Sequence, residues 1–298
     1  MTCVGLNEAS TRRDRVAQVS SDEFAAAYDA VLAQWPVAFE TLDIASRFGT
    51  TRVYAAGPPV ASPLVLFHGA GATASVWFAN IGVLSRAHRV YAVDCIYDKG
   101  RSVPSANPVQ TREDAMGWLD AVLDALEVAQ ADFCGHSYGC WLAVAYALHA
   151  RQRVHRLVLL DPTTLFVGFR PSYLLHALPT LVASNPRRQR GFLAWETGGR
   201  PLNPAWETVK ATPAGGKSPR FVMPKRPTEY QLGSLPAALV ILAERSRAIN
   251  PARAAEVARR LLPNVRVEFL AGASHHSIPT EDAAVLNAKL MAFLSNTP

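Results

Sequence analysis

The sequence predicts an α/β protein with a mostly parallel central sheet, helices on both faces of that sheet and an inserted helical cap. Short apolar segments without polar–apolar alternation recur along the chain, and segments with helical periodicity separate them. This pattern is typical of a parallel sheet that is covered on both faces. The pattern breaks over 163–235 and then resumes, which indicates an insertion. A chain of 298 residues is long enough for one such domain with an insertion.

The elements follow from periodicity and from turn residues. Helical spacing predicts a first helix over 22–34, which stops at Trp35-Pro36. Alternation over 39–55 predicts a β-hairpin that ends at Gly57. The predicted strands that follow are 63–67, 89–95, 132–136, 156–160, 238–242 and 265–270, and the predicted helices are 75–86, 111–128, 138–150, 251–262 and 280–294.

The same reading divides the chain into three parts. Residues 1–20 are polar and irregular, so we expect a flexible N-terminal arm. Residues 21–162 and 236–298 form the α/β core. The segment 163–235 is too long for a plain loop and is rich in aromatic side chains. We expect it to form a helical cap over the C-terminal edge of the sheet, where open α/β sheets bind ligands.

Composition excludes several classes of protein. Apolar residues make up 49% of the chain and charged residues 18%, which indicates a globular protein. The net charge of +6 is scattered, and the basic clusters at 12–15 and 187–190 lack interleaved aromatics, so we expect no nucleic-acid partner. We expect no membrane span and no secretory signal, because no apolar run reaches 18 residues and the N-terminus lacks an apolar segment.

Four cysteines, Cys3, Cys95, Cys134 and Cys140, form no metal-ligand cluster. We therefore expect free thiols in a reduced, cytoplasmic protein that needs neither a metal nor a cofactor.

A nucleophile motif lies in the middle of the chain. The pentapeptide Gly135-His136-Ser137-Tyr138-Gly139 follows an apolar strand and precedes an apolar helix. It fits the G-x-S-x-G nucleophile elbow, in which a sharp turn lifts the serine hydroxyl above the sheet. Glycines at both ends let the strand and the helix approach closely. Ser137 is therefore the candidate nucleophile.

Two backbone amides complete the expected oxyanion hole. The amide of Tyr138 directly follows the nucleophile, and a second amide must point to the same place. The segment 67–72, Phe-His-Gly-Ala-Gly-Ala, comes after the first central strand, and its small residues allow close approach. Ala70 is the candidate for the second amide.

The candidate general base lies after the last strand. The segment Gly272-Ala273-Ser274-His275-His276 holds two adjacent histidines. In this order of elements the triad runs serine, acid, histidine. We favour His275 over His276, because His275 directly follows the small Gly-Ala-Ser turn.

These motifs resemble those of the α/β-hydrolase superfamily. They are H-G-A-G-A at 68–72, G-H-S-Y-G at 135–139, L-L-D-P at 159–162, A-E-R-S-R at 243–247 and G-A-S-H at 272–275. The resemblance covers roughly residues 39–296. It implies that Ser137 is the nucleophile, that His275 is the general base, and that Ala70 and Tyr138 supply the oxyanion amides.

The chain departs from the superfamily at the acid. Many relatives carry an aspartate at the position of Ser246, and a serine cannot supply the negative charge. Some lipases and thioesterases of the superfamily place the acid after the strand that follows the nucleophile helix, which here is Asp161. We therefore favour Asp161 as the third triad residue, with Glu244 as the alternative.

The leading functional hypothesis is hydrolysis of a carboxylic ester, with a small or medium hydrophobic substrate, through an acyl-enzyme intermediate. The first alternative is a thioesterase or cyclase acting on a carrier-bound acyl chain, with the basic segment 187–190 meeting an acidic acyl-carrier protein. The second is a non-hydrolytic protein of the same fold.

Overall fold

A computed structural model describes residues 21–182, 185–214 and 221–295, so the predicted arm over 1–20 lies outside the described residues. Nine strands of the described chain form one sheet in the order β1-β2-β4-β3-β6-β7-β8-β9, with β5 paired to β2. The strands are β1 (Glu40–Ser46), β2 (Gly49–Ala56), β3 (Pro63–Phe67), β4 (Arg89–Val93), β5 (Val103–Pro104), β6 (Ala131–His136), β7 (Val154–Leu160), β8 (Ala238–Ala243) and β9 (Val265–Leu270).

The prediction of a mostly parallel sheet is confirmed. Strands β3, β4 and β6 to β9 pair in parallel, whereas β1, β2 and β5 pair antiparallel at one side of the sheet. Parallel strands end at a common edge, so the segments after β3, β6, β7, β8 and β9 meet there. Every motif identified from the sequence therefore lies at this edge of the sheet.

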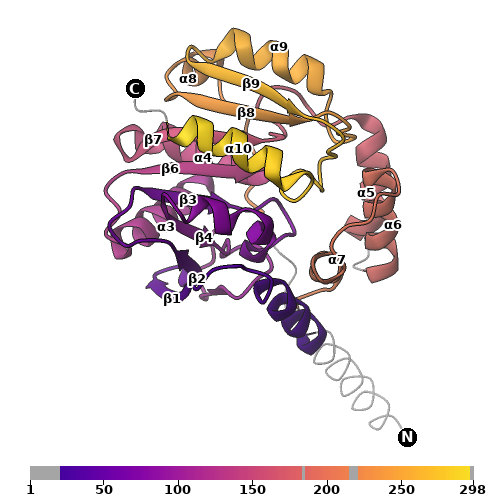
Figure 1. The fold of residues 1–298 in the computed structure, drawn as a ribbon, viewed down its shortest axis with the longest axis horizontal. Helices are drawn as coiled ribbons and strands as arrows, with labels where there is room; N and C mark the ends of the chain where they lie inside the picture. The colour runs from indigo at the N-terminus through magenta and orange to yellow at the C-terminus, as the bar shows by residue number, and fades with distance from the viewer. Residues whose placement is uncertain (1–20, 183–184, 215–220, 296–298) are drawn as a thin grey trace, which may run out of the picture.

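Both faces of the sheet are buried, which explains why the strands lack alternation. Along β3, Val65 and Phe67 join one apolar cluster, and Leu64 and Leu66 join the other. The first cluster includes helices α3 (Arg112–Ala125), α4 (Tyr138–His149) and α9 (Pro251–Leu261). The second includes the helical residues 21–32, α2 (Ile81–Leu84) and α10 (Ala283–Leu294). Figure 1 shows α10 in front of the sheet and α3 and α4 behind it.

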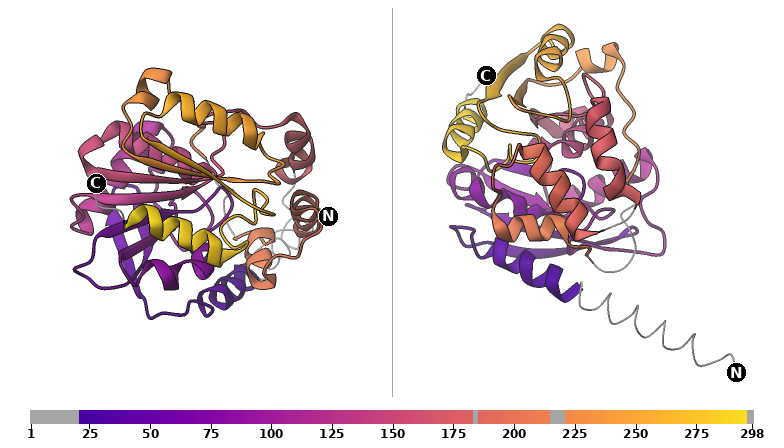
Figure 2. Two further views of the ribbon diagram at one scale, coloured as in Figure 1. Left: turned by 45° about the horizontal axis from the view of Figure 1, so that its top comes forward. Right: turned by 90° about the vertical axis from the view of Figure 1, so that its right-hand side faces the viewer.

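The chain between β7 and β8 holds helices α5 (Pro171–Val182), α6 (Pro186–Thr197), α7 (Pro204–Ala211) and α8 (Glu229–Gly233). Helices α5, α6 and α7 lie together beside the edge of the sheet at which the parallel strands end (Figure 1). The right-hand view of Figure 2 faces these three helices. These three helices of the insertion therefore lie beside the loops that carry the motifs.

The prediction of one continuous helix over 75–86 is wrong. A 3-10 helix, η1 (Ala74–Ala79), is followed by the separate helix α2. Asn80 lies between these two helices and interrupts the helical backbone with φ −117°. Its buried side chain donates a 2.9 Å hydrogen bond to Asn287 of α10. A tertiary contact thus overrides the helical periodicity. The last helix also begins later than predicted, because Asp282 adopts φ 41° immediately before Ala283.

None of the helices in the described residues is both long and apolar enough to cross a membrane.

Candidate active site

Ser137 occupies a strained turn between β6 and α4. Its backbone lies at φ 53° and ψ −114°, outside the regions that L-residues favour. A Cβ on Gly135 would lie 2.3 Å from the carbonyl of Gly139, and one on Gly139 would lie 2.4 Å from Phe67 O. Only glycine fits at these two positions, so the motif is required by the packing of β3, β6 and α4.

Three side chains from three strand ends form a continuous hydrogen-bonded row. Ser137 Oγ lies 2.8 Å from His275 Nε2, and His275 Nδ1 lies 2.6 Å from Asp161 Oδ2. All three residues are buried. An ionised Asp161 accepts from Nδ1–H, which leaves Nε2 free to accept the serine proton. The row can therefore activate Ser137 as a nucleophile.

Asp161 is held by more than the histidine. Its Oδ1 accepts a 3.1 Å bond from the backbone N–H of Ala243, and its Oδ2 accepts a 2.7 Å bond from Ser246 Oγ. Its own backbone lies at φ 44°, directly after β7. Three donors on a fully buried carboxylate stabilise its charged form. Ser246, the position at which many relatives carry the acid, thus donates a hydrogen bond to the candidate acid Asp161.

Glu244, the alternative acid, lies elsewhere. Its side chain is exposed, and its Oε2 accepts a 3.1 Å bond from the backbone N–H of Gly272. Glu244 therefore stabilises the start of the histidine loop, and no contact joins it to the imidazole of His275 in the described residues.

The segment after β3 lies against Ser137. A Cβ on Gly69 would lie 3.2 Å from Ser137 Cβ, so only the bare backbone can pass there. The amide of Ala70 has no hydrogen-bond partner among the described residues. Tyr138 is the first residue of α4, where the N–H groups have no partner within the helix. In the described part of the chain neither predicted amide has a hydrogen-bond partner, and both lie on segments that meet at Ser137.

The remaining histidines near the site are held by structural contacts. His276 Nε2 lies 3.1 Å from the hydroxyl of Tyr173, and His136 Nε2 donates a 2.8 Å bond to the carbonyl of His275. Burial lowers the pKa of both His136 and His276 well below the usual value, so both stay neutral. His68 accepts from the Cys95 N–H and donates to Gly69 O, which supports the loop beneath Ala70.

Glu196 of α6 was not predicted from the sequence. Its carboxylate is 1% exposed and accepts three bonds from the histidine loop: 2.9 Å from His275 N, 3.1 Å from His276 N and 2.7 Å from Ser274 Oγ. The inserted segment therefore holds the backbone of the loop that carries His275. A glutamate in an amphipathic segment carries no local signal for such a role.

Lys210, at the end of α7, was also not predicted. Its Nζ donates a 2.6 Å bond to the carbonyl of Ala70, so the inserted segment contacts the loop after β3 as well.

Aromatic side chains from the insertion pack beside the histidine loop. The ring of Tyr173 lies 6.1 Å from that of His275, centroid to centroid, in an edge-to-face arrangement. Phe169 stacks on Tyr173, and Phe192 and Trp195 lie on its other sides. The neighbourhood of the row is therefore apolar and aromatic.

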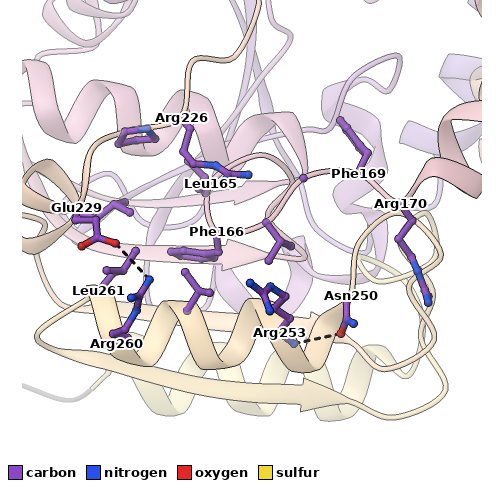
Figure 3. Close-up of a pocket in the computed structure, with 15 residues that line it drawn as sticks. Leu165, Phe166, Phe169, Arg170, Arg226, Glu229, Asn250, Arg253, Arg260 and Leu261 are labelled. Carbon is purple, nitrogen blue, oxygen red and sulfur yellow. Dashed lines mark hydrogen bonds and ion pairs between the residues drawn. The ribbon is translucent and has the colours of Figure 1, made fainter.

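A separate cavity of about 460 Å³ lies between the segment 165–170 and helix α9 (Figure 3). Four arginines and Glu229 surround its apolar lining, and Glu229 pairs with Arg260 at 3.3 Å. Ser137, His275 and Asp161 do not line it. No group of three or more His, Cys, Asp or Glu side chains in the described part of the chain could hold a metal ion.

The chain is similar to known proteins over most of its length. The sequence profile of the Alpha/beta hydrolase family matches residues 64–289. The chain belongs to the alpha/beta hydrolase family. In sequence it is 31% identical to "Carboxylesterase YbfK" of Bacillus subtilis (strain 168), over 91% of this chain and 93% of that protein. It is 32% identical to "Uncharacterized carboxylesterase nap" of the same organism, over 90% and 91%.

Solved structures of this family agree. The crystal structure of carboxylesterase CesB (YbfK) from Bacillus subtilis matches with a TM-score of 0.84 and 30% identity, covering 92% of this chain and 98% of that one. The structure of naproxen esterase (carboxylesterase NP) from Bacillus subtilis also has a TM-score of 0.84, with 31% identity and the same coverage. The chain is thus similar to these esterases over nearly its whole length.

Proposed function

We propose that this protein is a carboxylic-ester hydrolase that acts through an acyl-enzyme on Ser137. The observation that carries the proposal is the hydrogen-bonded row of Ser137, His275 and Asp161. The similarity to two Bacillus carboxylesterases over about nine-tenths of the chain supports the same activity.

The reaction follows from this arrangement in two halves. Ser137 Oγ bonds to the ester carbonyl carbon while His275 Nε2 takes its proton. The amides of Ala70 and Tyr138 stabilise the resulting oxyanion. His275 then gives the proton to the alkoxy oxygen, the bond from carbon to that oxygen breaks, and the alcohol leaves. Water repeats the sequence on the acyl-enzyme and releases the acid.

Asp161 orients His275 and stabilises the imidazolium that forms during each half-reaction. The hydrogen bonds from Ser246 and Ala243 keep its carboxylate in place. We assign it this role in preference to Glu244, whose carboxylate accepts from Gly272 N.

The insertion shapes the substrate preference in this proposal. The aromatic group of Phe169, Tyr173, Phe192 and Trp195 favours a small or medium hydrophobic substrate. A cap over 163–235 and a cytoplasmic location, in keeping with three buried free thiols at Cys95, Cys134 and Cys140, are part of the same proposal. We propose no carrier-protein partner, because the relatives that match nearly the whole chain are named carboxylesterases.

The test uses the intact enzyme and a Ser137→Ala variant. We expect a fluorophosphonate probe to label Ser137 in the intact enzyme, and we expect Ser137→Ala to lose kcat by several orders of magnitude while keeping its circular dichroism spectrum. Near-normal turnover by the folded variant contradicts an acyl-enzyme. Matched oxygen esters and thioesters then separate esterase from thioesterase by kcat/KM.

A further inference from the structure

Lys210 places a buried ammonium group against the loop that carries the proposed oxyanion amide. The residue is 5% exposed, and its Nζ donates a 2.6 Å bond to the carbonyl of Ala70. A Cβ on Gly71 would lie 3.6 Å from the same Nζ. Gly69, one residue before Ala70, packs against Ser137, so one short loop contacts both the ammonium and Ser137.

The charges that face Lys210 come from several elements. Its ammonium interacts electrostatically with carboxylates and histidines around the site and with a second lysine: Asp98, Glu196, His136, His276 and Lys99. Neither carboxylate among them lies within 4 Å of Nζ in the described structure. Asp98 accepts instead from the N–H groups of Gly71 and Lys99.

Lys99 provides the contrast within the same cluster. Its Nζ donates to three carbonyls at the end of α7, at 2.7 Å to Val209, 2.7 Å to Lys210 and 3.4 Å to Thr212. All three of its ammonium hydrogens therefore have an acceptor, and it holds α7 against the core. Lys210 also has three hydrogens, but Ala70 O is its one hydrogen-bond acceptor among the described residues.

A buried ammonium with unused donors is costly unless an anion pairs with it. Burial lowers the pKa of Lys210 to about 8, so the group is still charged at pH 7. In the proposed function the ester lies between the amide of Ala70 and Ser137, beside the loop that Lys210 contacts, and a carboxylate on it would supply a partner for the ammonium.

We propose that Lys210 binds a free carboxylate on the substrate, so that the preferred substrates are esters carrying a second, ionised carboxyl group. This inference rests on the proposed esterase function and specifies its substrate class. The rest of the substrate remains apolar, because the aromatic side chains of α5 and α6 face the histidine loop.

The first test compares charged and neutral esters with the unmodified enzyme. One pair is mono-4-nitrophenyl adipate and its methyl ester, with the charge on the acyl part. The other is 4-carboxyphenyl hexanoate and its methyl ester, with the charge on the leaving group. We expect kcat/KM to be at least about tenfold higher for the charged member of one pair, and that pair identifies which part of the substrate meets Lys210. Equal or lower kcat/KM for the charged member of both pairs overturns the inference.

The second test asks whether Lys210 causes the preference. Lys210→Met keeps the length of the side chain and removes its charge, and we expect the ratio of the two kcat/KM values to fall to about one. Lys210→Arg keeps the charge, and we expect it to retain most of the ratio. Lys225→Met removes the charge of an exposed lysine of the same insertion and serves as the control. An equal fall of the ratio in Lys225→Met contradicts a direct contact with Lys210.

The two proposals fail in different ways. If none of the four esters is turned over, the proposed function fails. If the neutral esters are hydrolysed and the charged ones have no advantage, esterase activity stands and the role of Lys210 is wrong. The comparison with unmodified enzyme needs no variant to fold, and circular dichroism verifies the fold of each variant used.

Discussion

Ser246 Oγ donates a 2.7 Å hydrogen bond to Asp161 Oδ2, the same oxygen that lies 2.6 Å from His275 Nδ1. The position at which many members of the superfamily carry the triad acid therefore faces Asp161, the proposed acid of this chain, across one hydrogen bond. The neighbouring parallel strands β7 and β8 thus bring Asp161 and Ser246 together at their ends.

Asp161→Asn tests the proposed acid. The change preserves the shape but removes the charge that holds the imidazole and stabilises its protonated form. We expect kcat to fall by up to about 10⁴, as in the serine-protease precedent. Glu244→Gln is the matched control and should cost far less, since Glu244 accepts from Gly272 N. A larger loss in Glu244→Gln than in Asp161→Asn would reverse the assignment.

Moving the charge tests the relation between positions 161 and 246. In the double variant Asp161→Asn with Ser246→Asp, the new carboxylate starts within one hydrogen bond of the site that His275 contacts. We expect kcat to recover at least about tenfold relative to Asp161→Asn, since the imidazole regains an anionic partner. The control is Asp161→Asn with Ser246→Asn, which has the same shape without the charge. Equal kcat in the two double variants rules out rescue by charge.

Glu196→Gln tests the link between α6 and the histidine loop. Glutamine keeps the size of the side chain, but an NH2 group replaces one carboxylate oxygen. This NH2 group is a donor and would face the N–H and O–H donors of the loop. Hydrogen bonds to a charged group stabilise the folded protein by about 1.5–3 kcal/mol each. Because these bonds hold the loop that positions His275, we expect their loss to lower kcat by about 10- to 100-fold. KM for a small ester should change little, because Glu196 contacts the loop backbone and Ser274.

Glu207→Gln is the control for Glu196, because it lies on the neighbouring helix α7 and its carboxylate is 3.9 Å from Arg190. It should retain kcat. If Glu196→Gln is folded and changes KM alone, the residue acts on substrate binding and does not position His275.

The preference for carboxylate-bearing esters should depend on pH in a defined direction. The pKa of Lys210 is lowered to about 8 by burial, so its ammonium loses the proton as pH rises through 8. A substrate carboxylate stays ionised over the same range. We expect the ratio of kcat/KM for charged and neutral esters to be highest near pH 7 and to approach that of Lys210→Met by pH 9.5. Lys210→Arg should keep its preference at pH 9.5, because guanidinium remains protonated. A ratio that stays constant from pH 7 to 9.5 in the unmodified enzyme excludes Lys210 as its source.

Local sequence was enough for the features that depend on contiguous residues. The apolar strands, the tight turn at Ser137 and the histidine after β9 can each be read from fewer than ten residues. The physical reason is steric: a strand, a glycine-bounded turn and a helix must follow one another for the serine to adopt φ 53°. The same local reasoning misjudged 75–86, where Asn80 bonds to Asn287 more than 200 residues later.

The sequence by itself determined the parallel α/β fold, the nucleophile motif and the candidate base, and it reduced the acid to Asp161 or Glu244. Only the tertiary structure showed which of the two carboxylates contacts the imidazole: the order β6-β7-β8-β9 brings Asp161, at the end of β7, to His275, while the exposed Glu244 accepts from Gly272 N. Only the tertiary structure showed Glu196 at the histidine loop and Lys210 at Ala70. Their partners lie 79 and 140 residues away along the chain, and burial of a charged group against a distant backbone leaves no periodic signal in the sequence.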